Sequence, residues 1–477
     1  MLFNSLDFAI FLPIVFILYW FVTNKNLKLQ NFLIVAASYL FYGWWDWRFL
    51  SLIIFSTIVD YTIGLKINTQ ENQTKRKALL WASIIVNLGF LGFFKYYNFF
   101  LDNFVSAFSF FGTPINAQGL NIILPVGISF YTFQTLSYSI DVYKRKLEPT
   151  KDFVAFTAFV SFFPQLVAGP IERASNLLPQ FYKSRVFRSK PALDGVKQIV
   201  WGFFMKLVIA DNCASYANQI FNDYESYSWS SLFIGALMFT FQIYGDFAGY
   251  SNIAIGVSRL FGFNLKQNFA FPYFSRDIAE FWRRWHISLS TWFRDYLYIP
   301  LGGSRVSNVK KVRNTFIIFM VSGFWHGANW TFVFWGLLNA IYFLPLLLLK
   351  KNRTYLGVIG NNSFPQLNEI FGMIITFLLT VLAWVFFRAA NITEAYGIIK
   401  NILTLQQGNR IDIPVTIVLI LVTFILIEWY GRRSEFAIQN SFKNYPILKR
   451  VFTYIITISI FMFGQFNSNY EFIYFQF

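Results

Sequence analysis

Charged residues are scarce in this chain. Only 13% of its 477 residues are Asp, Glu, Lys or Arg, whereas a soluble domain typically carries about 25%. A chain of this length with so few charges could not cover a globular surface in water. Hydrophobic residues make up 56% of the sequence, including 62 phenylalanines. The composition therefore predicts an integral membrane protein and excludes an ordinary soluble domain.

Cysteine and histidine are rarer still. The chain has one cysteine, Cys213, and two histidines, His286 and His326. One cysteine excludes an intrachain disulfide, and three such scattered side chains do not supply the closely spaced ligand pairs of a zinc site. We therefore expect no metal and no permanently bound cofactor. The formal net charge of +17 is best interpreted as basic loops that face anionic lipid, because no stretch resembles a nucleic-acid-binding module.

Long apolar segments recur along the chain, and we expect about 10–12 of them to span the bilayer. The candidates are residues 6–23, 29–45, 49–65, 78–94, 120–140, 153–169, 195–211, 232–261, 315–349, 370–388, 413–430 and 451–466. Breaks at Pro125-Val126-Gly127 and Ala168-Gly169-Pro170 are typical of re-entrant segments buried in protein. No polar stretch is long enough for a soluble domain, so residues 1–477 are expected to form one all-α membrane-embedded domain.

Basic loops predict the orientation of these segments, because Lys and Arg are retained on the cytoplasmic side. The loops are 66–77, 141–151, 183–197 and 305–313. Loops 66–77 and 141–151 can share a side only if an even number of helices crosses between them. The aromatic stretch 96–111 is therefore expected to be an interfacial helix on the outer side.

The first apolar run does not have the charge pattern of a signal peptide. Asp7 precedes it, and Lys25 and Lys28 follow it, whereas a signal peptide carries its basic residues before the apolar run. We expect a retained first helix with its N-terminus outside the cytoplasm.

One histidine lies within residues 279–294. Six apolar side chains fall on one face if this segment is a single helix. They are Phe281, Trp282, Trp285, Leu289, Trp292 and Phe293. His286 sits at the border of that face, and the charged residues lie off it. The pattern predicts an amphipathic helix at an interface or beside a polar cavity; an ordinary interfacial helix anchored by Trp and Arg is the alternative.

The other histidine lies inside an apolar run. His326 is twelve residues beyond Asn314, which on a helix is about 18 Å and places the imidazole deep in a hydrocarbon core of about 30 Å. Ionisable groups at such depth are costly and are functional candidates by default. Gly323 and Gly327 flank His326 and would allow a helix or a substrate to approach closely. A packing histidine bonded between helices is the alternative.

A buried, neutral imidazole suits one kind of chemistry. Burial disfavours the imidazolium cation, so the ring can accept a proton from a hydroxyl that attacks an acyl carbonyl. No Gly-x-Ser-x-Gly motif accompanies it, which favours direct transfer over a serine acyl-enzyme. Other ionisable residues in apolar runs are interpreted as pairing groups between helices, with Asp246 the most suggestive. These residues are Asp60, Lys206, Asp246, Arg388 and Glu428.

These segments resemble the membrane-bound O-acyltransferase (MBOAT) family, in the bacterial branch of the alginate O-acetylation and teichoic-acid D-alanylation membrane proteins. The strongest match is FPYFSR at 271–276, EFWRRWH at 280–286 and WFRDYLYIPLGG at 292–303. The SGFWHG segment at 322–327 resembles the active-site motif of the family. Weaker matches are VAGPI at 167–171, DFAGYS at 246–251 and FIYFQF at 472–477. The resemblance spans nearly the whole chain.

The resemblance implies a fold, a reaction and site residues. The family fold is a ring of tilted helices around a thin floor, where an acyl group passes from a cytoplasmic donor to an acceptor on the other side. The catalytic histidine maps onto His326 and the second catalytic-region residue onto His286, with Trp325, Trp285 and Asp246 in supporting positions. The implied donor is an acyl-CoA or acyl carrier protein thioester, and the implied location is the bacterial inner membrane.

The acceptor and partners stay open at this point. The resemblance implies acetylation of a cell-surface polysaccharide such as alginate, together with an extracytoplasmic acetyltransferase or other polysaccharide-modifying partner. Another exopolysaccharide, peptidoglycan and teichoic acid are alternatives. A transporter or flippase of lipid-linked sugars would share the composition, and so would a scaffold of a synthase complex, but neither requires histidines within specific motifs.

Overall fold

The computed structural model describes residues 1–112, 115, 117–167, 169–357, 364–466 and 472–473. Regular structure within these ranges is helical, and the only β-type pairing there is an isolated bridge between Tyr227 and Asn409. The chain forms two compact units. Unit 1 comprises Met1–Gly195 and Val257–Lys266, and unit 2 comprises Val196–Gly256 and Gln267–Phe477. The protein is thus an all-α protein, as predicted.

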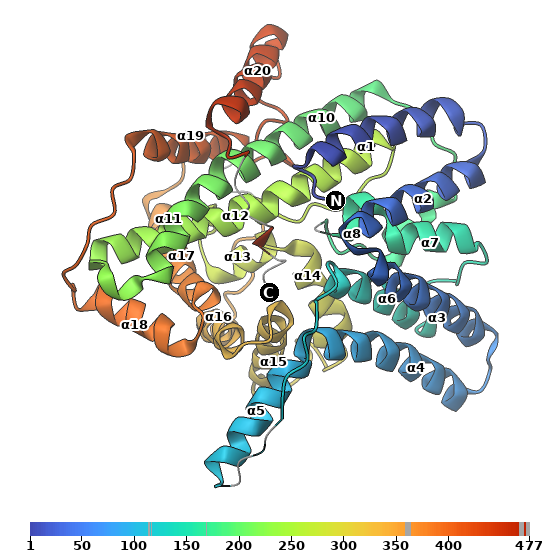
Figure 1. Ribbon diagram of the computed structural model, residues 1–477, viewed down its shortest axis with the longest axis horizontal. Coiled ribbons are helices and arrows are strands. Elements are labelled where there is room, and N and C mark those ends of the chain that lie inside the picture. The colour runs from blue at the N-terminus through green and yellow to red at the C-terminus, as the bar shows by residue number, and fades with distance from the viewer. Residues whose placement is uncertain (113–114, 116, 168, 358–363, 467–471, 474–477) are drawn as a thin grey trace. The chain divides into compact units, whose positions relative to one another are not determined.

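Unit 1 contains the N-terminal helices (Figure 1, blue to teal). They are α1 (Leu6–Ile17), α2 (Leu27–Asp46), α3 (Leu50–Thr69), α4 (Gln73–Leu91), α5 (Tyr97–Phe110), α6 (Ile128–Tyr143), α7 (Phe153–Ser161), α8 (Phe163–Leu166) and α9 (Ala174–Leu177). Short π-helical or 3₁₀ turns extend several of them, at Leu18–Val22, Trp47–Phe49, Gly92–Tyr96 and Leu178–Phe181. Two further helices, α10 (Ser189–Phe203) and α12 (Trp229–Leu260), contribute residues to both units.

Buried polar groups join the helices of unit 1. Asp60 of α3 is fully buried and accepts hydrogen bonds from Ser83 and Asn87 of α4 at 2.5 and 2.8 Å. It also accepts one from Ser139 of α6 at 3.0 Å. A buried carboxylate must be satisfied in this way, because its desolvation is costly. Asp60 therefore links three helices, which agrees with its interpretation as a pairing group.

The two expected breaks in unit 1 lie next to each other. Helix α6 begins only after Gly127, whose φ of 75° is left-handed, so the expected span 120–140 starts late. A Cβ at Gly127 would lie 2.8 Å from the carbonyl oxygen of Leu166 at the end of α8. Glycine is therefore required at this close approach. Ala168 of the second break lies outside the described residues.

The aromatic stretch expected at an interface is helical. Helix α5 has no buried residue, and Phe100, Phe104 and Phe110 are among its exposed side chains. Such a helix suits contact with lipid. Its side of the membrane stays a prediction.

Unit 2 contains the remaining helices (Figure 1, green to red). They are α11 (Asp211–Asn222), α13 (Ile278–Arg284), α14 (Ile287–Phe293), α15 (Asn308–His326), α16 (Trp330–Leu348), α17 (Leu367–Arg388), α18 (Ile392–Leu403), α19 (Val415–Gly431) and α20 (Pro446–Phe463). Additional π-helical or 3₁₀ turns lie at Phe204–Ala210, Tyr224–Ser226, Pro272–Phe274 and Arg294–Tyr298.

The apolar run 315–349 is not one segment but a helical hairpin. Helix α15 ends at His326, and α16 begins at Trp330 after an extended Gly327. The two helices lie side by side (Figure 1). A Cβ at Gly323 would be 2.1 Å from the carbonyl oxygen of Phe332, and a Cβ at Gly336 would be 2.3 Å from that of Phe319. These glycines accommodate the partner helix, which is the small-residue contact common in membrane bundles.

The helices confirm a multi-pass membrane protein. Within the described ranges, six helical stretches are long and apolar enough to cross a bilayer, and three shorter apolar helices accompany them. The longer ones are Leu27–Thr69, Gln73–Phe110, Trp229–Leu260, Trp330–Leu348, Leu367–Arg388 and Pro446–Phe463. The first two combine more than one helix. The count of 10–12 spans and the ring arrangement stay predictions.

A substitution at Gly323 tests the close contact within the hairpin. Gly323→Ala should destabilise the protein by about 1–3 kcal/mol, because the added methyl group overlaps backbone atoms that cannot rotate away. Gly89→Ala in α4 is the matched control, since no atom lies within 4 Å of a Cβ there and alanine favours helix by about 1 kcal/mol. Thermal unfolding in detergent measures both. Equal midpoints for the two variants would contradict the packing.

Candidate active site

The segment 279–294 is broken at His286. Helix α13 ends at Arg284, Trp285 is extended, and His286 is left-handed with φ 43° and ψ 54°. The prediction of one continuous amphipathic helix is therefore wrong. A left-handed conformation costs a non-glycine residue about 1–2 kcal/mol, so neighbouring contacts must hold it. Because of this break, the imidazole is completely buried instead of lying at the border of an interfacial face.

Asn268 holds the break in place. Its backbone carbonyl accepts the N–H of Ile287 at 2.9 Å. Its Oδ1 accepts the backbone N–H of Ser288 at 3.2 Å and the Ser288 hydroxyl at 2.8 Å. The oxygen atoms of Asn268 thus accept the backbone N–H groups of Ile287 and Ser288, which a continuous helix would bond to its own carbonyl groups. The left-handed residue is thus stabilised by a side chain eighteen positions earlier.

The same contacts determine which ring nitrogen of His286 carries the proton. Nδ1 lies 3.2 Å from Asn268 Oδ1, and that atom must be an oxygen because it accepts the backbone N–H of Ser288. Nδ1 also lies 3.5 Å from the Ser288 hydroxyl, whose own proton goes to Asn268. Nδ1 is therefore the donor, and Nε2 bears the lone pair of the neutral ring. Burial lowers the pKa of His286 to about 3, so the ring is neutral at physiological pH.

The two histidines lie in one buried cluster of packed aromatic side chains, which is called the chamber below. The centroids of the His286 and His326 rings are 6.4 Å apart, and the side chains are 0% and 2% exposed. Trp325 packs against both rings, at 6.1 Å from His286 and 5.0 Å from His326. Phe247 of α12 packs edge-on against His286 at 4.6 Å. Residues forty positions apart thus share a site lined by aromatic rings.

The end of α15 positions His326. The ring packs edge-on against Trp335 of α16 at 5.2 Å and against Phe387 of α17 at 5.3 Å. Gly327 does not leave room for a substrate, because a Cβ there would meet the Phe332 ring at 2.1 Å. Of the two alternatives expected for these glycines, close approach of a helix and close approach of a substrate, the first is the one observed, because α16 occupies the space beside both. Asn329 caps α16 by accepting the backbone N–H of Thr331 at 3.0 Å, which fixes where the hairpin turns.

The three supporting residues have different surroundings. Trp325 lines the chamber. Trp285 lies one layer behind it and packs on Trp384 at 5.0 Å, which stacks on Trp335 at 5.6 Å. Asp246 belongs to a separate buried ion cluster. The structure therefore brings Trp325 next to both histidines but not Asp246.

Asp246 takes part in a buried network of ion pairs and hydrogen bonds. Its carboxylate lies 2.9 Å from the ammonium group of Lys206, which also pairs with Asp211 at 2.8 Å. The other oxygen of Asp246 accepts the backbone N–H of Ile473 at 2.6 Å. The buried cation thus lies between two carboxylate groups, and such pairing offsets the cost of burying it. Of the weak family match at 472–477, only the first two residues lie within the described ranges.

Sequence reasoning missed several residues of the site. Asn268 and Ser288 position His286, while Phe247, Trp335 and Phe387 pack against the imidazoles. Ser288 lies two residues from His286, but nothing in the spacing of Asn268 relates it to the histidine. The aromatic residues are indistinguishable by type from the many others in the chain.

The fold and the chamber together define a class of protein. It is a multi-pass membrane protein with two imidazoles buried among aromatic rings, where proton transfer and charge stabilisation can occur away from water. The chain matches the model of the MBOAT, membrane-bound O-acyltransferase family over residues 146–355, which include both histidines.

Curated relatives extend this match over most of the chain. The probable alginate O-acetylase AlgI of Pseudomonas aeruginosa is 37% identical over 91% of this chain and 82% of the relative. The peptidoglycan O-acetyltransferase of Helicobacter pylori is 38% identical over 85% and 80%. The teichoic acid D-alanyltransferase of Streptococcus thermophilus is 34% identical over 45% and 55%. This chain belongs to the membrane-bound O-acyltransferase family and is an O-acyltransferase.

Replacement of His286 tests its role separately from its strained backbone. His286→Ala should lower turnover about 10²–10⁴-fold, the usual contribution of a proton-transfer or hydrogen-bonding group. His286→Asn is the companion variant, because asparagine tolerates the left-handed conformation and preserves the turn. The O-acyl content of the product and size-exclusion profiles in detergent are measured together. Loss of folded protein in both variants, or near wild-type turnover in either, would contradict a role in the reaction.

Proposed function

We propose that this enzyme passes an acetyl group from a cytoplasmic thioester donor to the hydroxyl of a cell-surface polysaccharide or of an extracytoplasmic partner. The main structural support is that His286 and His326 lie close together in one buried chamber. The acetyl group is favoured because two relatives that cover at least 85% of this chain are named O-acetylase and O-acetyltransferase. The D-alanyltransferase relative covers only 45%.

His326 is the general base in this proposal. Its neutral imidazole takes the proton of the acceptor hydroxyl while the oxygen attacks the thioester carbonyl. The new C–O bond forms, the C–S bond breaks, and the proton passes from the imidazolium to the departing thiolate. Atoms and electrons balance without a covalent enzyme intermediate.

His286 supports the reaction from its fixed position. Because Nδ1 donates a hydrogen bond to Asn268 Oδ1 at 3.2 Å, Nε2 is the ring nitrogen that can accept a hydrogen bond from the acceptor hydroxyl and orient it. The surrounding aromatic rings exclude water, which strengthens each electrostatic contact with the developing charge. Trp325, in contact with both imidazoles, keeps their separation constant.

We propose an alginate-like exopolysaccharide as the final acceptor and the bacterial inner membrane as the location, with the N-terminus outside. Acyl-CoA and an acyl carrier protein both supply the required thioester. An extracytoplasmic acetyltransferase or polysaccharide-modifying protein is the proposed partner. The identities to the alginate and peptidoglycan enzymes are nearly equal, so acetylation assays should include both polymers.

Variants of His326 test the proposal. His326→Ala should abolish acyl transfer to the surface polymer while the protein still inserts and folds. His326→Gln should fail as well, because an amide keeps hydrogen bonding but cannot take a proton at neutral pH. Acetyl released from purified polymer measures activity, and size-exclusion chromatography verifies folding.

Two results would overturn this assignment. One is near wild-type transfer by a folded His326→Ala protein. The other is equal activity of His326→Gln and wild type, which would assign His326 a hydrogen-bonding role only. Incorporation of D-alanine instead of acetate would replace the acyl group in the proposal and leave the catalytic base unchanged.

A further inference from the structure

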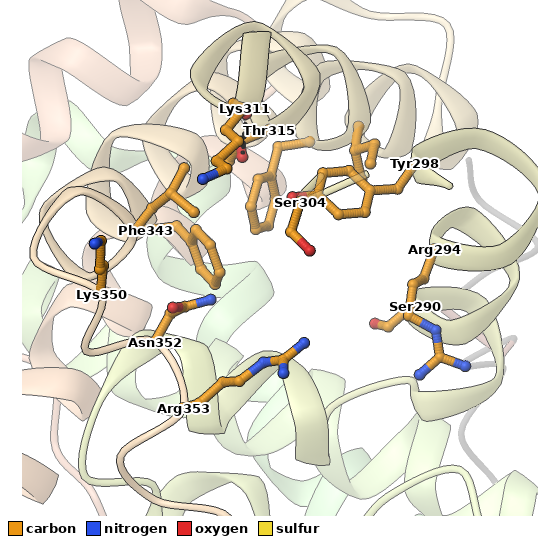
Figure 2. Close-up of a pocket in the computed structure, with 13 residues that line it drawn as sticks. Ser290, Arg294, Tyr298, Ser304, Lys311, Thr315, Phe343, Lys350, Asn352 and Arg353 are labelled. Carbon is orange, nitrogen blue, oxygen red and sulfur yellow. Dashed lines mark hydrogen bonds between the residues drawn. The ribbon is translucent and has the colours of Figure 1, made fainter. Parts of the chain in front are cut away.

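A basic pocket lies in unit 2 outside the histidine chamber. Its volume is about 370 Å³. Figure 2 shows labelled side chains from α15, α16 and the segments beside them around an open centre. The lining residues are Ser290, Arg294, Tyr298, Ser304, Lys311, Thr315, Ile318, Phe319, Phe343, Leu347, Lys350, Asn352 and Arg353. The labelled cationic side chains Arg294, Lys311, Lys350 and Arg353 are distributed around the centre, and Phe343 lies among them (Figure 2).

The charges of this pocket are of one sign. Four of its thirteen lining residues are Lys or Arg, and none of those lining residues is Asp or Glu. The exposed guanidinium group of Arg294 pairs with Asp295 at 2.7 Å. Such a cluster repels itself in the empty state and is stabilised by a polyanion. Guanidinium and ammonium groups beside hydroxyls are the donors that bind phosphate.

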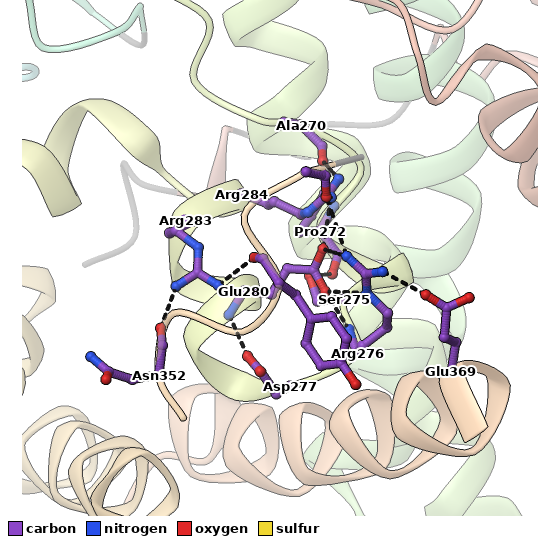
Figure 3. A network of polar contacts seen from close by, with 12 residues as sticks. Ala270, Pro272, Ser275, Arg276, Asp277, Glu280, Arg283, Arg284, Asn352 and Glu369 are labelled. Carbon is purple, nitrogen blue, oxygen red and sulfur yellow. Dashed lines mark hydrogen bonds and ion pairs between the residues drawn. The ribbon is translucent and has the colours of Figure 1, made fainter. Parts of the chain in front are cut away.

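An arginine network fixes one rim of the pocket (Figure 3). Arg283 donates to the backbone carbonyls of Asn352 and Tyr355, at 2.9 and 2.7 Å. Arg276 and Arg284 both donate to the carbonyl of Gly357, at 3.2 and 3.1 Å. Three guanidinium groups thus hold the segment 352–357, in which Arg353 faces the pocket.

Carboxylates keep these arginines in place. Glu280 pairs with Arg276 at 2.9 Å and with Arg284 at 2.7 Å, and Glu369 pairs with Arg276 at 2.6 Å. The Glu280 side chain is 1% exposed. A buried network of this kind loses much more when one member is removed than a surface ion pair would. The rim is therefore preorganised before any ligand binds.

A line of aromatic rings leads from the pocket to the chamber. Phe319, on the apolar side, packs on Trp282 at 5.3 Å. Trp282 packs on Trp335 at 5.6 Å, and Trp335 packs on His326 at 5.2 Å. The basic pocket and the proposed base are thus joined by three consecutive ring contacts within unit 2.

We propose that this pocket recognises the phosphate groups of a ligand whose remaining part is an apolar or flexible arm, and that Arg283 is a positioning residue for its rim. Two sources share this chemistry: a phosphate-bearing thioester donor and an anionic phospholipid headgroup. Binding of the thioester donor rests on the proposed function, whereas binding of a phospholipid does not. The cationic side chains hold the phosphates, and the arm lies along Phe319 and Phe343.

Direct binding tests the pocket without catalysis. Coenzyme A and pantetheine are titrated against purified protein in phosphatidylcholine nanodiscs; pantetheine is the thiol arm of coenzyme A without its phosphates and adenosine. The variant Lys350→Gln/Arg353→Gln should bind coenzyme A about tenfold more weakly, since each exposed charge contact is worth up to about 1 kcal/mol. Lys310→Gln/Lys351→Gln is the matched control, because it removes the same charge from neighbouring exposed positions that do not line the pocket.

A separate experiment tests whether the phosphate ligand is an anionic phospholipid. Nanodiscs that contain cardiolipin are compared with phosphatidylcholine alone, and protein-bound lipid is quantified for the lining pair and the control pair. Selective loss of coenzyme A binding in the lining pair assigns the pocket to the donor, and selective loss of cardiolipin assigns it to the headgroup. Equal effects of the two pairs would overturn phosphate recognition. So would equal binding of coenzyme A and pantetheine together with no retained cardiolipin.

Arg283 provides a second and separate test. A lysine at position 283 cannot donate to both backbone carbonyl groups, so Arg283→Lys should weaken binding of the phosphate ligand several-fold. If that ligand is the donor, the variant should also raise the donor KM several-fold with little change in kcat. An equal fall in kcat would contradict a positioning role. The coenzyme A titration is repeated with His326→Gln. Binding that is retained without turnover shows that the pocket acts independently of the catalytic step, so the two proposals can fail separately.

Discussion

The left-handed backbone of His286, held by Asn268, is the constraint on which the arrangement of the two histidines depends. A continuous helix over 279–294 would place the imidazole at the edge of an apolar face. The break instead turns the ring inward, to 6.4 Å from His326. Backbone strain at functional sites persists only where the surroundings over-determine it. Here three hydrogen bonds to Asn268 serve that purpose.

Buried charged residues of unit 2 hold irregular segments of the chain in place. Lys206 joins Asp211 and Asp246, and through Asp246 it reaches the backbone of Ile473. The network of Glu280 in the same way fixes the segment after α16. Buried ion pairs add little net stability, but the loss of one partner is strongly destabilising. Such clusters therefore specify where irregular segments lie around the chamber and the basic pocket.

The sequence predicted what periodicity and rarity can reveal. Long apolar runs indicated a membrane protein, and two histidines within specific motifs indicated the candidate site. It could not predict that 279–294 breaks, because the hydrogen bonds responsible come from Asn268 in another segment. It also left open whether a helix or a substrate approaches Gly323 and Gly327, and the turn to α16 brings Phe332 against both. Tertiary contacts determine the break at His286 and the packing of these glycines, and such contacts leave no recognisable pattern in the local sequence.

The central claim is that His286 and His326 act in one chemical step, and a double-mutant cycle tests it most directly. Acetyl transfer is measured in proteoliposomes for His286→Ala, His326→Ala and the double variant. Groups that act as a unit are strongly non-additive, so the double variant should be no slower than the slower single variant. Rate losses that multiply, as independent contributions do, would contradict a shared catalytic centre.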